Sequence, residues 1–406
     1  MKVLQINSVY HYGSTGRIVE SIHKNLIKEK IPSYIIYGRK YYKDDASFFV
    51  GNRITFLTDV CLSLVMDSHG LNNKNSTRKI IEIIEKYNPD IIHIHNIHGF
   101  YANYELLFDF LAGKKIPIII TLHDCWLYTG FCAYYDFINC KEWEANCNSC
   151  KARFCYPYRL LNLNTERNFY KKKMLLEKID NLTIVTPSSW LKKEVKKSFL
   201  KERNILVINN GINLDAFYKE NTGKTIFNYG KKVLLGVASV WEKRKGLEEY
   251  EKLASKLPEE YQIVLIGISK KQSLKLNKRI ICFPRTNSID ELRLFYSNAF
   301  MLLNLTLEDN FPTVNIEALA CELPILTYNT GGSAEIVGDC GWIIKKRNLD
   351  DVLKCLENLN EEEYLEKKVK CRKRALNYSE YKMSRNYINL YRKIAGEIHE
   401  KSNLAD

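Results

Sequence analysis

Short apolar segments alternate with amphipathic segments along most of the chain. The first two apolar segments, 3–9 and 34–38, have the length and composition of buried strands. Between them, apolar residues recur at intervals of three and four from Ile18 to Ile27, which predicts a helix with one buried face. Similar patterns continue to about residue 220 and resume at about residue 231. This order of strands and helices predicts two α/β domains, each built on a largely parallel sheet.

The pattern also indicates where the domains begin and end. A chain of 406 residues is too long for one comfortable core and suits two domains. We expect an N-terminal domain at 1–220, with a cysteine-rich insertion at 125–157 that departs from the α/β pattern. A polar, glycine-containing linker is predicted at about 218–230 and a C-terminal domain at 231–378, while 379–406 has the spacing of a last helix.

The stretch 300–337 carries the densest group of candidate chemical residues. An apolar strand pattern is followed by an acidic, proline-containing loop and then by a helical pattern. In such a unit the N–H groups of the first helical turn point beyond the strand end, where a phosphate would bind. Asp309 in the loop and Glu317 in the helix can approach one bound molecule from two sides. A second loop, Thr330-Gly331-Gly332, again permits close approach of the backbone.

This block resembles the nucleotide-sugar signature of retaining glycosyltransferase family 4. The family usually has Glu at the first acidic position, where this chain has Asp309. The resemblance covers nearly the whole chain and is strongest over 232–337. The features that carry it are Asp309 and Glu317 with seven residues between them, Ala318 to Cys321, Pro324, and Thr330 to Glu335.

The resemblance implies a fold and an activity. The fold is GT-B, an α/β architecture with two Rossmann-like domains facing a central cleft and a C-terminal helix that crosses back to the first domain. The activity is that of a retaining hexosyltransferase, which moves a sugar from a nucleoside-diphosphate donor to a hydroxyl of a growing, lipid-linked glycan. The His-Asp-Cys-Trp segment at 123–126 resembles family members that make capsule and colanic-acid polysaccharides. No acidic cluster of the DxD type is placed to bridge a diphosphate, so we expect no cofactor in catalysis.

The resemblance also assigns residues to the donor. Glu317 is expected to bind the ribose hydroxyls, while Asp309 addresses the donor sugar and phosphate. Gly13 and Gly16 lie in a strand, loop and helix unit that faces the donor phosphates, although a simple tight turn is the alternative. The loop and helix positions expected to contact the donor are Asn310, Phe311, Thr313 and Val314.

A basic loop follows the strand predicted at 232–240. Cations at this turn would neutralise the diphosphate as it leaves. Lys245 matches the lysine of the family, with Arg244 as a helper in donor binding. Family members usually carry an arginine five residues before this lysine, where this chain has Val240. A solvated run of charge is the alternative.

Histidines gather where two predicted strands end. Ligands of open parallel sheets bind at the carboxyl ends of the strands. His123 follows one of these strands, and the resemblance implies that it contacts the donor sugar; with Lys245 and Asp309 it makes up the expected catalytic set. The other strand carries three histidines that we interpret as acceptor-binding, with packing of imidazoles or a metal site as alternatives: His93, His95 and His98.

Twelve cysteines in a chain without a signal peptide argue against a disulfide framework. Six of them lie in the insertion at 125–157. Their density is compatible with a structural zinc ion, and free buried thiols are the alternative. The four candidate ligands are Cys132, Cys140, Cys147 and Cys150.

Charge and hydropathy suggest where the protein works. The chain has 61 basic and 47 acidic residues, a net charge of +14, which suits phosphorylated ligands, an anionic membrane or nucleic acid. No apolar segment reaches the ~18 residues of a membrane span. We therefore expect a cytoplasmic protein that can associate peripherally with the inner face of the plasma membrane. The basic amphipathic helix at 190–199 is the candidate for that contact, with a solvated surface helix as the alternative.

Two other classes of function remain open. A GT-B relative that epimerises nucleotide sugars, or only binds them, would keep the carboxylate pair. A basic nucleic-acid-binding protein with a zinc module would account for the charge and the cysteines, but no recognition motif of interleaved aromatic and basic residues is present, so we expect no nucleic-acid partner. The donor nucleotide, the sugar, the acceptor and the linkage depend on loop geometry that the sequence leaves open.

Overall fold

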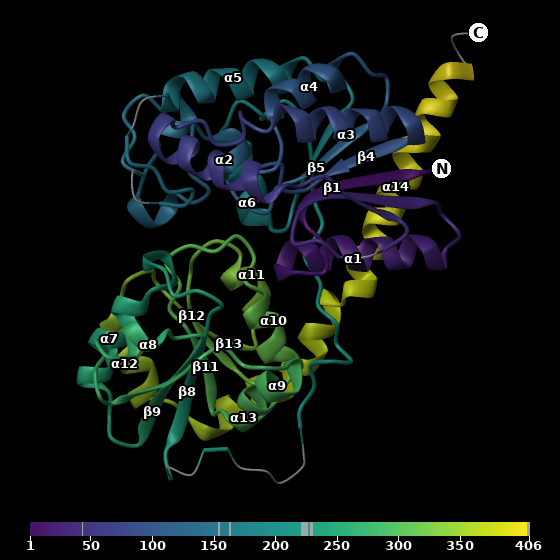
Figure 1. Cartoon of the computed structure of the whole chain (residues 1–406). Coiled ribbons are helices and arrows are strands. Elements are labelled where there is room, and N and C mark those ends of the chain that lie inside the picture. The colour runs from purple at the N-terminus through teal and green to yellow at the C-terminus, as the bar shows by residue number, and fades with distance from the viewer. Residues whose placement is uncertain (43, 153–154, 162–163, 221–225, 228–229, 404–406) are drawn as a thin grey trace. The chain divides into compact units, whose positions relative to one another are not determined.

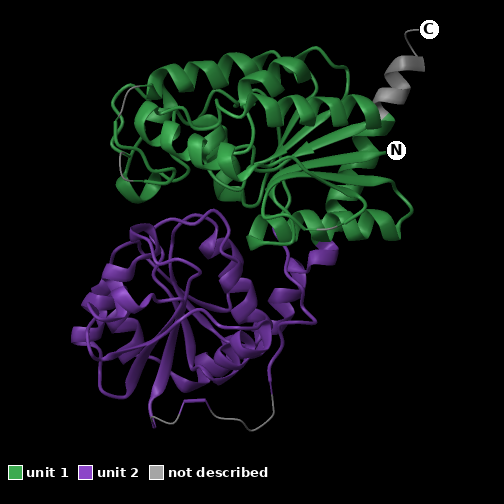
Figure 2. Ribbon diagram, in the orientation of Figure 1, with its two compact units in different colours: residues 1–209, 383–406 green, residues 210–382 purple. Residues whose placement is uncertain are grey.

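The computed structural model describes residues 1–406 except 43, 153–154, 162–163, 221–225, 228–229 and 404–406 (Figure 1). The chain forms two compact units, one made of residues 1–209 and 383–406 and the other of residues 210–382 (Figure 2). Much of the predicted linker, 221–225 and 228–229, lies outside the described residues.

The first unit is built on a seven-stranded parallel sheet with the order β3-β2-β1-β4-β5-β6-β7. Its central strands are buried and rich in isoleucine and valine, as expected where helices cover both faces of a parallel sheet (Figure 1). The strands are β1 Val3–Val9, β2 Ser33–Arg39, β3 Ser47–Phe49, β4 Ile91–Ile94, β5 Ile118–Thr121, β6 Leu182–Thr186 and β7 Asn204–Val207. The helices are α1 Gly13–Lys28, α2 Arg53–Met66, α3 Lys74–Tyr87, α4 Tyr104–Ala112, α5 Thr165–Glu177 and α6 Ser189–Val195, joined by most of α14, Glu380–Asn403.

Helix α14 begins in the second unit and contributes its residues from Met383 onwards to the first. Met383, Tyr387 and Ile388 are buried in the hydrophobic core of the first unit. The hydroxyl of Tyr387 lies 2.9 Å from Oγ1 of Thr121, at the end of β5. These contacts explain why the tail has apolar residues at helical spacing although it follows the second domain in sequence.

The insertion between β5 and α5 contains three short 3₁₀ helices, η1 Trp126–Tyr128, η2 Asp136–Ile138 and η3 Glu142–Glu144. Aromatic residues fill its interior: Trp143 and Tyr135 are buried, with ring centroids 4.6 Å apart. The segment after it is tied to the end of α2 by a fully buried ion pair, in which Arg159 Nη1 lies 2.7 Å from Asp67 Oδ2. The insertion is therefore held by side-chain packing and ionic contacts.

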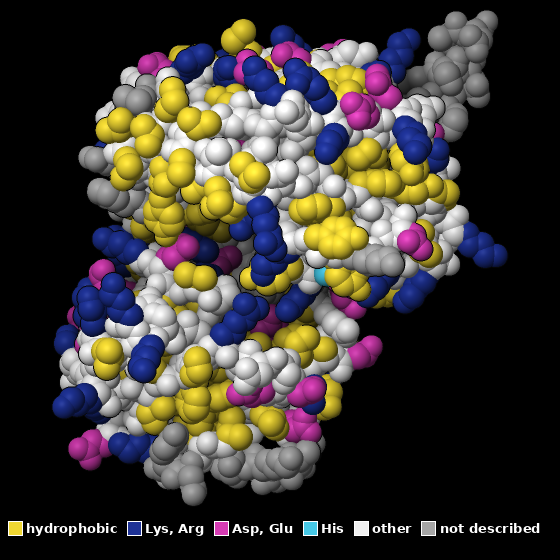
Figure 3. Space-filling model, in the orientation of Figure 1, with side chains coloured by type: hydrophobic (Ala, Val, Ile, Leu, Met, Phe, Trp, Pro, Cys, Tyr) yellow, Lys and Arg dark blue, Asp and Glu magenta, His cyan; other side chains and the backbone are white. Residues whose placement is uncertain are grey.

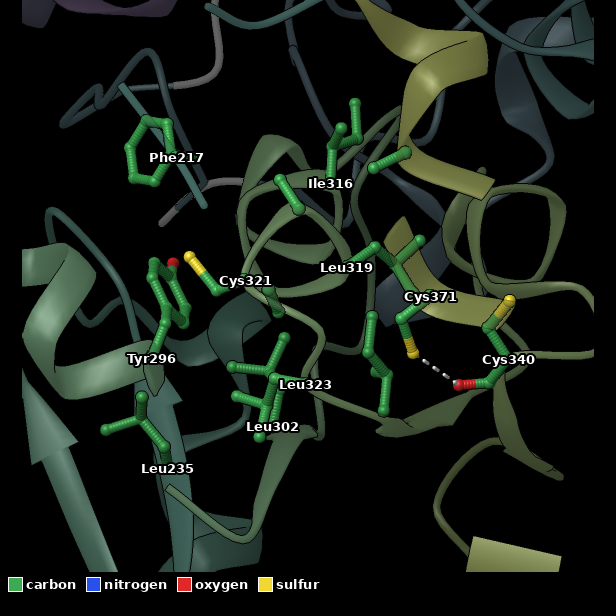
Figure 4. Packing of buried hydrophobic residues seen from close by; sticks show 14 of the residues in the cluster. Phe217, Leu235, Tyr296, Leu302, Ile316, Leu319, Cys321, Leu323, Cys340 and Cys371 are labelled. Atoms are coloured by element: carbon green, nitrogen blue, oxygen red, sulfur yellow. Dashed lines mark hydrogen bonds between the residues drawn. The ribbon is translucent and has the colours of Figure 1, made fainter. Parts of the chain in front are cut away.

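The second unit contains a six-stranded parallel sheet with the order β10-β9-β8-β11-β12-β13. The strands are β8 Lys232–Val237, β9 Tyr261–Ile266, β10 Ile280–Phe283, β11 Met301–Asn304, β12 Ile325–Tyr328 and β13 Gly341–Ile344. The helices are α7 Leu247–Lys256, α8 Lys270–Ser273, α9 Ile289–Asn298, α10 Thr313–Ala320, α11 Ser333–Val337, α12 Leu349–Glu357 and α13 Glu361–Ala375, with 3₁₀ helices η4 Lys243–Lys245 and η5 Leu376–Tyr378. Helix α10 is embedded in the core, where Ile316 and Leu319 pack among residues of the neighbouring elements (Figure 4).

Two expected elements differ from the structure. The strand predicted at 232–240 ends at Val237, because the chain turns there into the basic loop. The helix predicted at 190–199 extends only from Ser189 to Val195, and Leu191 and Val195 are fully buried. Since this helix turns its apolar residues into the core, we no longer assign it to a membrane contact. Among the described residues, no helix has the length and apolar character needed to cross a bilayer.

Candidate functional site

The candidate site of the second unit lies where the strand order of its sheet reverses. Strands β8 and β11 are neighbours, and the chain proceeds outward from them in opposite directions, to β9 and to β12. The loops that follow two such strands diverge and leave room for a ligand at the carboxyl edge of the sheet. Here the loop after β8 contains η4, and the loop after β11 leads into α10.

These two loops bring Lys245 and Asp309 together. Nζ of Lys245 donates a short hydrogen bond to Oδ2 of Asp309, and Nη1 of Arg244 lies 3.7 Å from the same oxygen. Arg244 also joins the backbones of the two loops: its Nη1 donates to the carbonyl of Glu308 at 3.2 Å, and its own carbonyl accepts from the N–H of Leu307 at 2.7 Å. The sequence-predicted cations and the loop carboxylate therefore form one cluster.

Burial and neighbouring charges shift the pKa values of Lys245 and Asp309 in opposite directions. Burial lowers the pKa of Lys245, and the nearby Asp309 partly offsets that effect. Burial would raise the pKa of Asp309, but the charges of Lys245 and Arg244 outweigh it and hold that pKa below its usual value. Asp309 is therefore ionised at neutral pH, and Lys245 has a fixed counterion that an anionic ligand could compete with.

Glycines allow the loops to approach one another closely. Gly331 has a positive φ of 52°, and a Cβ there would lie 1.8 Å from the carbonyl oxygen of Asp309. The next residue, Gly332, donates its N–H to that oxygen at 3.1 Å. Any side chain at position 331 would therefore force the Asp309 loop away from its present place.

Glu317 is held by a residue that the sequence did not single out. Tyr296, on α9, donates its hydroxyl to Oε2 of Glu317 at 2.8 Å. Burial and the adjacent carboxylate raise the pKa of Tyr296, so its hydroxyl stays protonated and remains a donor. Figure 4 shows Tyr296 within the core of this unit, close to Cys321. Nothing in the sequence around Tyr296 sets it apart from an ordinary core aromatic residue.

The predicted donor-binding positions near α10 differ in accessibility. Asn310 and Phe311 are buried, and the Phe311 ring packs against Tyr378 at a centroid distance of 5.6 Å. Thr313 and Val314 are half-buried in the first turn of α10. The residue before this turn is Pro312, whose side chain cannot cap the helix, so first-turn N–H groups lack an N-cap side-chain acceptor. Of these positions, Phe311 therefore supports the loop by packing on Tyr378, and Thr313 and Val314 are the more accessible ones.

In the first unit, the histidines do gather at the carboxyl ends of β4 and β5. Nδ1 of His95 lies 3.0 Å from Nε2 of His123, and their rings are stacked. Nε2 of His98 lies 2.8 Å from Oδ2 of Asp124. Burial lowers the pKa of His123 to about 4, although Asp124 works against that effect, so His123 is neutral at neutral pH. A neutral imidazole can position a sugar hydroxyl but is a weak proton donor.

A small cavity adjoins these side chains. It measures about 10 Å³ and is lined in part by His95, His98 and His123. That volume holds about one water molecule. The cavity is therefore too small for a sugar, whereas His123 itself is partly exposed.

His93 is fully buried in the first unit. Its Nδ1 lies 2.6 Å from the hydroxyl of Tyr391 on α14, and its Nε2 lies 2.8 Å from Oγ1 of Thr121. Both ring nitrogens thus have partners inside the unit, and this geometry favours the packing interpretation of His93 over acceptor binding.

The glycine loop after β1 has the predicted local form. Helix α1 starts at Gly13, whose φ is 68°, and Gly16 is buried against Val9. A Cβ at Gly16 would lie 3.3 Å from Val9 Cγ2, so a larger residue would push the helix start away from the strand. The role of Gly13 and Gly16 towards a donor stays a prediction.

Two family models together match nearly the whole chain. Residues 16–216 match Glycosyltransferase Family 4, and residues 218–378 match Glycosyl transferases group 1. The chain belongs to glycosyltransferase family 4. Family 4 enzymes retain the anomeric configuration of the transferred sugar, so the family and the enzyme class expected from the sequence are confirmed.

The curated relatives of this family 4 chain are distant. A putative colanic acid biosynthesis glycosyl transferase, WcaC of Escherichia coli, is 22% identical over 53% of this chain and 55% of its own length. The capsular polysaccharide biosynthesis glycosyltransferase CapM of Staphylococcus aureus is 27% identical over 52% of this chain and 61% of its own length. An uncharacterized glycosyltransferase of Methanocaldococcus jannaschii, MJ1178, is 26% identical over 89% of this chain and 90% of its own. The chain thus spans little more than half of the first of these relatives.

Solved structures show the fold. Sucrose-phosphate synthase from Thermosynechococcus elongatus matches with a TM-score of 0.70 at 13% identity, over 98% of this chain and 100% of that one. WaaG, a glycosyltransferase involved in lipopolysaccharide biosynthesis, matches with a TM-score of 0.65 at 15% identity, over 96% and 99%. These neighbours and the two parallel sheets confirm the predicted GT-B class.

The structure bears on the predicted zinc site through the described cysteines of the insertion. Among the described residues, no three His, Cys, Asp or Glu side chains are grouped so as to hold a metal ion. Cys132, Cys140 and Cys147 are buried, and burial raises the pKa of each thiol, to about 12 for Cys147. Sγ of Cys150 instead accepts a hydrogen bond from Arg159 at 2.7 Å. The structure therefore gives the zinc hypothesis no support, and the alternative of free buried thiols stays a prediction.

The contact between Tyr296 and Glu317 makes a testable prediction. Tyr296→Phe removes the hydroxyl that orients Glu317 and leaves the ring in place, so we expect donor affinity to fall by about 3- to 10-fold, the effect of losing one ordinary hydrogen bond. Isothermal titration with the donor nucleotide would measure the change. Tyr364→Phe is the control, because the Tyr364 hydroxyl bonds the carbonyl of Phe300, before the amino end of β11. Equal affinities for wild type and Tyr296→Phe would show that Glu317 needs no such support.

Proposed function

We propose that this chain transfers a sugar from a nucleoside-diphosphate donor to a hydroxyl of a glycan during the synthesis of a bacterial cell-surface polysaccharide. The observation that carries the proposal is the cluster of Lys245, Arg244 and Asp309 at the strand-order reversal, beside the first turn of α10. Two cations and a helix N-terminus at one sheet edge suit a diphosphate.

Similar proteins support the class of donor. A structure of HepE from Anabaena, in complex with UDP, matches with a TM-score of 0.61 at 12% identity, over 97% of this chain and 100% of that one. WcaC and CapM are named for colanic acid and capsular polysaccharide biosynthesis, which supports a polysaccharide product. These likenesses are distant, so the donor and the product are part of the proposal.

The proposed chemistry needs no nucleophilic side chain. The bond between the sugar C1 and the diphosphate oxygen breaks, and a bond between C1 and the acceptor oxygen forms on the same face. The acceptor proton passes to an oxygen of the departing diphosphate. Lys245 and Arg244 stabilise the negative charge that develops there, because their positions are set before the reaction begins.

The remaining predicted residues have supporting roles in this proposal. Glu317, fixed by Tyr296, receives the ribose hydroxyls, and Asp309 positions Lys245 and contacts the donor sugar. In the first unit, the neutral His123 contacts a sugar hydroxyl, His95 contacts the ring of His123, and His98 contacts Asp124, the residue next to His123. A lipid-linked oligosaccharide is the proposed acceptor, and the proposal uses no catalytic metal.

A thermal-shift screen against nucleoside diphosphates and nucleotide sugars tests the donor site. Bound ligand at about a hundred times its Kd should stabilise the protein by roughly 2.7 kcal/mol. We expect Glu317→Ala to lose most of the shift, and Glu259→Ala to keep it, because Glu259 is exposed at the amino edge of the same sheet. Absence of a shift with every nucleotide would overturn the donor proposal. Conversion of the donor sugar without any acceptor would point instead to an epimerase.

A further inference from the structure

Helix α2 buries polar residues and exposes large apolar residues. Its two fully buried residues are polar, Asp59 and Ser63. Its exposed side carries large apolar residues: Ile54 is 73% exposed and Leu57 63%, and Leu62 and Val65 follow on the same side one and two turns later. A surface helix of a water-soluble domain normally has the opposite arrangement. The outer side of α2 is therefore built to contact something apolar.

A second segment extends this apolar side. The N–H of Leu160 donates to the carbonyl of Leu64 at 2.7 Å, which fixes the segment against the last turn of α2. Leu160 is 57% exposed, and Leu161 beside it is also exposed. We call these six residues the α2 face: Ile54, Leu57, Leu62, Val65, Leu160 and Leu161. Figure 3 shows apolar side chains gathered over the part of the first unit where Figure 1 draws α2. Scattered apolar residues are normal on a surface, but a group of them on one side of a helix and on the segment bound to it indicates an interaction site.

The acidic group of α2 is withdrawn from this face. Asp59 is buried, and its carboxylate accepts hydrogen bonds from Ser63 at 2.9 Å, from Asn72 at 2.7 Å and from Asn73. No other acidic residue occurs between residues 46 and 66. The helix thus keeps a carboxylate for its own anchoring and presents none on its outer side.

Cations lie at the amino end of the same helix. Arg53, the first residue of α2, is exposed. The guanidinium of Arg39 lies 5.0 Å from the ring centroid of Phe56, and Lys40 next to it is exposed. An apolar stripe with cations at its end and no acidic residue matches the surface of an anionic bilayer, where acyl chains lie beside negative headgroups. A protein partner would more often be met by charges of both signs.

We propose that the α2 face binds the surface of an anionic lipid bilayer. Ile54, Leu57, Leu62 and Val65 enter the boundary between headgroups and acyl chains, and Arg53 and Arg39 bind lipid phosphates. The buried network around Asp59 holds α2 on the protein while its apolar side is in lipid. Such a contact would bring the first unit to a lipid-linked acceptor if the proposed function is correct, but the binding itself needs no donor chemistry.

Vesicle sedimentation of the full chain tests this proposal. We expect wild-type protein to sediment with vesicles of phosphatidylglycerol and phosphatidylcholine, and less with phosphatidylcholine alone. The double variant Leu57→Glu, Leu62→Glu should lower binding to anionic vesicles by about tenfold or more, because two charges would have to enter the apolar layer. Both side chains are exposed, so the fold should tolerate the change, and a retained melting temperature and donor-induced thermal shift would verify that.

The matched control replaces exposed apolar residues of the second unit. Leu274→Glu and Val369→Glu, at positions 82% and 80% exposed, should leave vesicle binding unchanged. Failure of the wild type to bind anionic vesicles would overturn the proposal, as would equal binding by the α2 variant. A wild-type dimer that the α2 variant converts to monomer, without vesicle binding, would show that a second copy covers this face instead. If the donor nucleotide causes no thermal shift in the wild-type protein, the proposed function is contradicted. The measured binding to anionic vesicles would not be affected by that outcome.

Discussion

Lys245→Ala should lower the turnover number of sugar transfer by about 10²- to 10³-fold, the range seen when one preorganised stabilising group is removed from a transition state. Nζ of Lys245 is fixed by Asp309, and Arg244 reaches the same carboxylate. The alanine variant would lose the positive charge that we place beside the departing diphosphate. It would also leave Asp309 without its closest cation. Release of the nucleoside diphosphate from donor and acceptor, measured under saturating conditions, would give the change.

Lys243→Ala is the control for this experiment. Lys243 lies in the same basic run, but its side chain is exposed, so we expect less than a twofold effect. A nucleotide-induced thermal shift in the Lys245→Ala protein would show that the fold and part of the donor site persist. Turnover close to that of wild type in Lys245→Ala would contradict the proposed role of this lysine.

Asp67→Ala should destabilise the first unit by about 3–5 kcal/mol, as expected when one partner of a buried ion pair is removed. Asp67 and Arg159 both have fully buried side chains, and their ionic contact is 2.7 Å long. Arg159 also packs over the ring of Phe131, 3.9 Å from its centroid, and its side chain is not exposed to water. The cost arises because the variant leaves that charge buried without a counterion. Urea unfolding followed by a probe in the first unit would measure the loss.

An exposed ion pair of the same unit provides the comparison. Asp109 lies 3.2 Å from Lys178, and both side chains are at least half exposed. Asp109→Ala should therefore cost no more than about 1 kcal/mol. Similar losses in the two variants would mean that Arg159 finds another partner when Asp67 is removed.

The order of strands and helices could be predicted from the sequence because hydrophobic periodicity is a local property. The apolar segment at 3–9 is β1, Val3–Val9, and the spacing from Ile18 to Ile27 lies within α1, Gly13–Lys28. The end of β8 could not be predicted from the sequence, because the apolar pattern continues to Val240 while the strand ends at Val237. Periodicity indicates which residues can be buried but not where tertiary contacts cause the chain to turn.

Contacts between residues that are far apart in the sequence could be identified only from the structure. Glu317 was predictable as a site residue from its place in the family motif, but its partner Tyr296 lies on another helix and has no motif of its own. The exposure of apolar residues on two helices likewise needed the structure. The pattern at 190–199 suggested a membrane contact, yet Leu191 and Val195 are buried, whereas the apolar side of α2 is exposed.

The sequence alone determined the class of this protein: two α/β domains, the family 4 motif from Asp309 to Glu335, and the basic residues Arg244 and Lys245. These features are encoded in short segments whose chemistry does not depend on distant contacts. Tertiary structure alone decided that Lys245 pairs with Asp309, that His93 is held by α14, and that the outer side of α2 is apolar. The physical reason is that burial, pairing and exposure are set by which segments pack together, and this packing joins residues far apart in the chain.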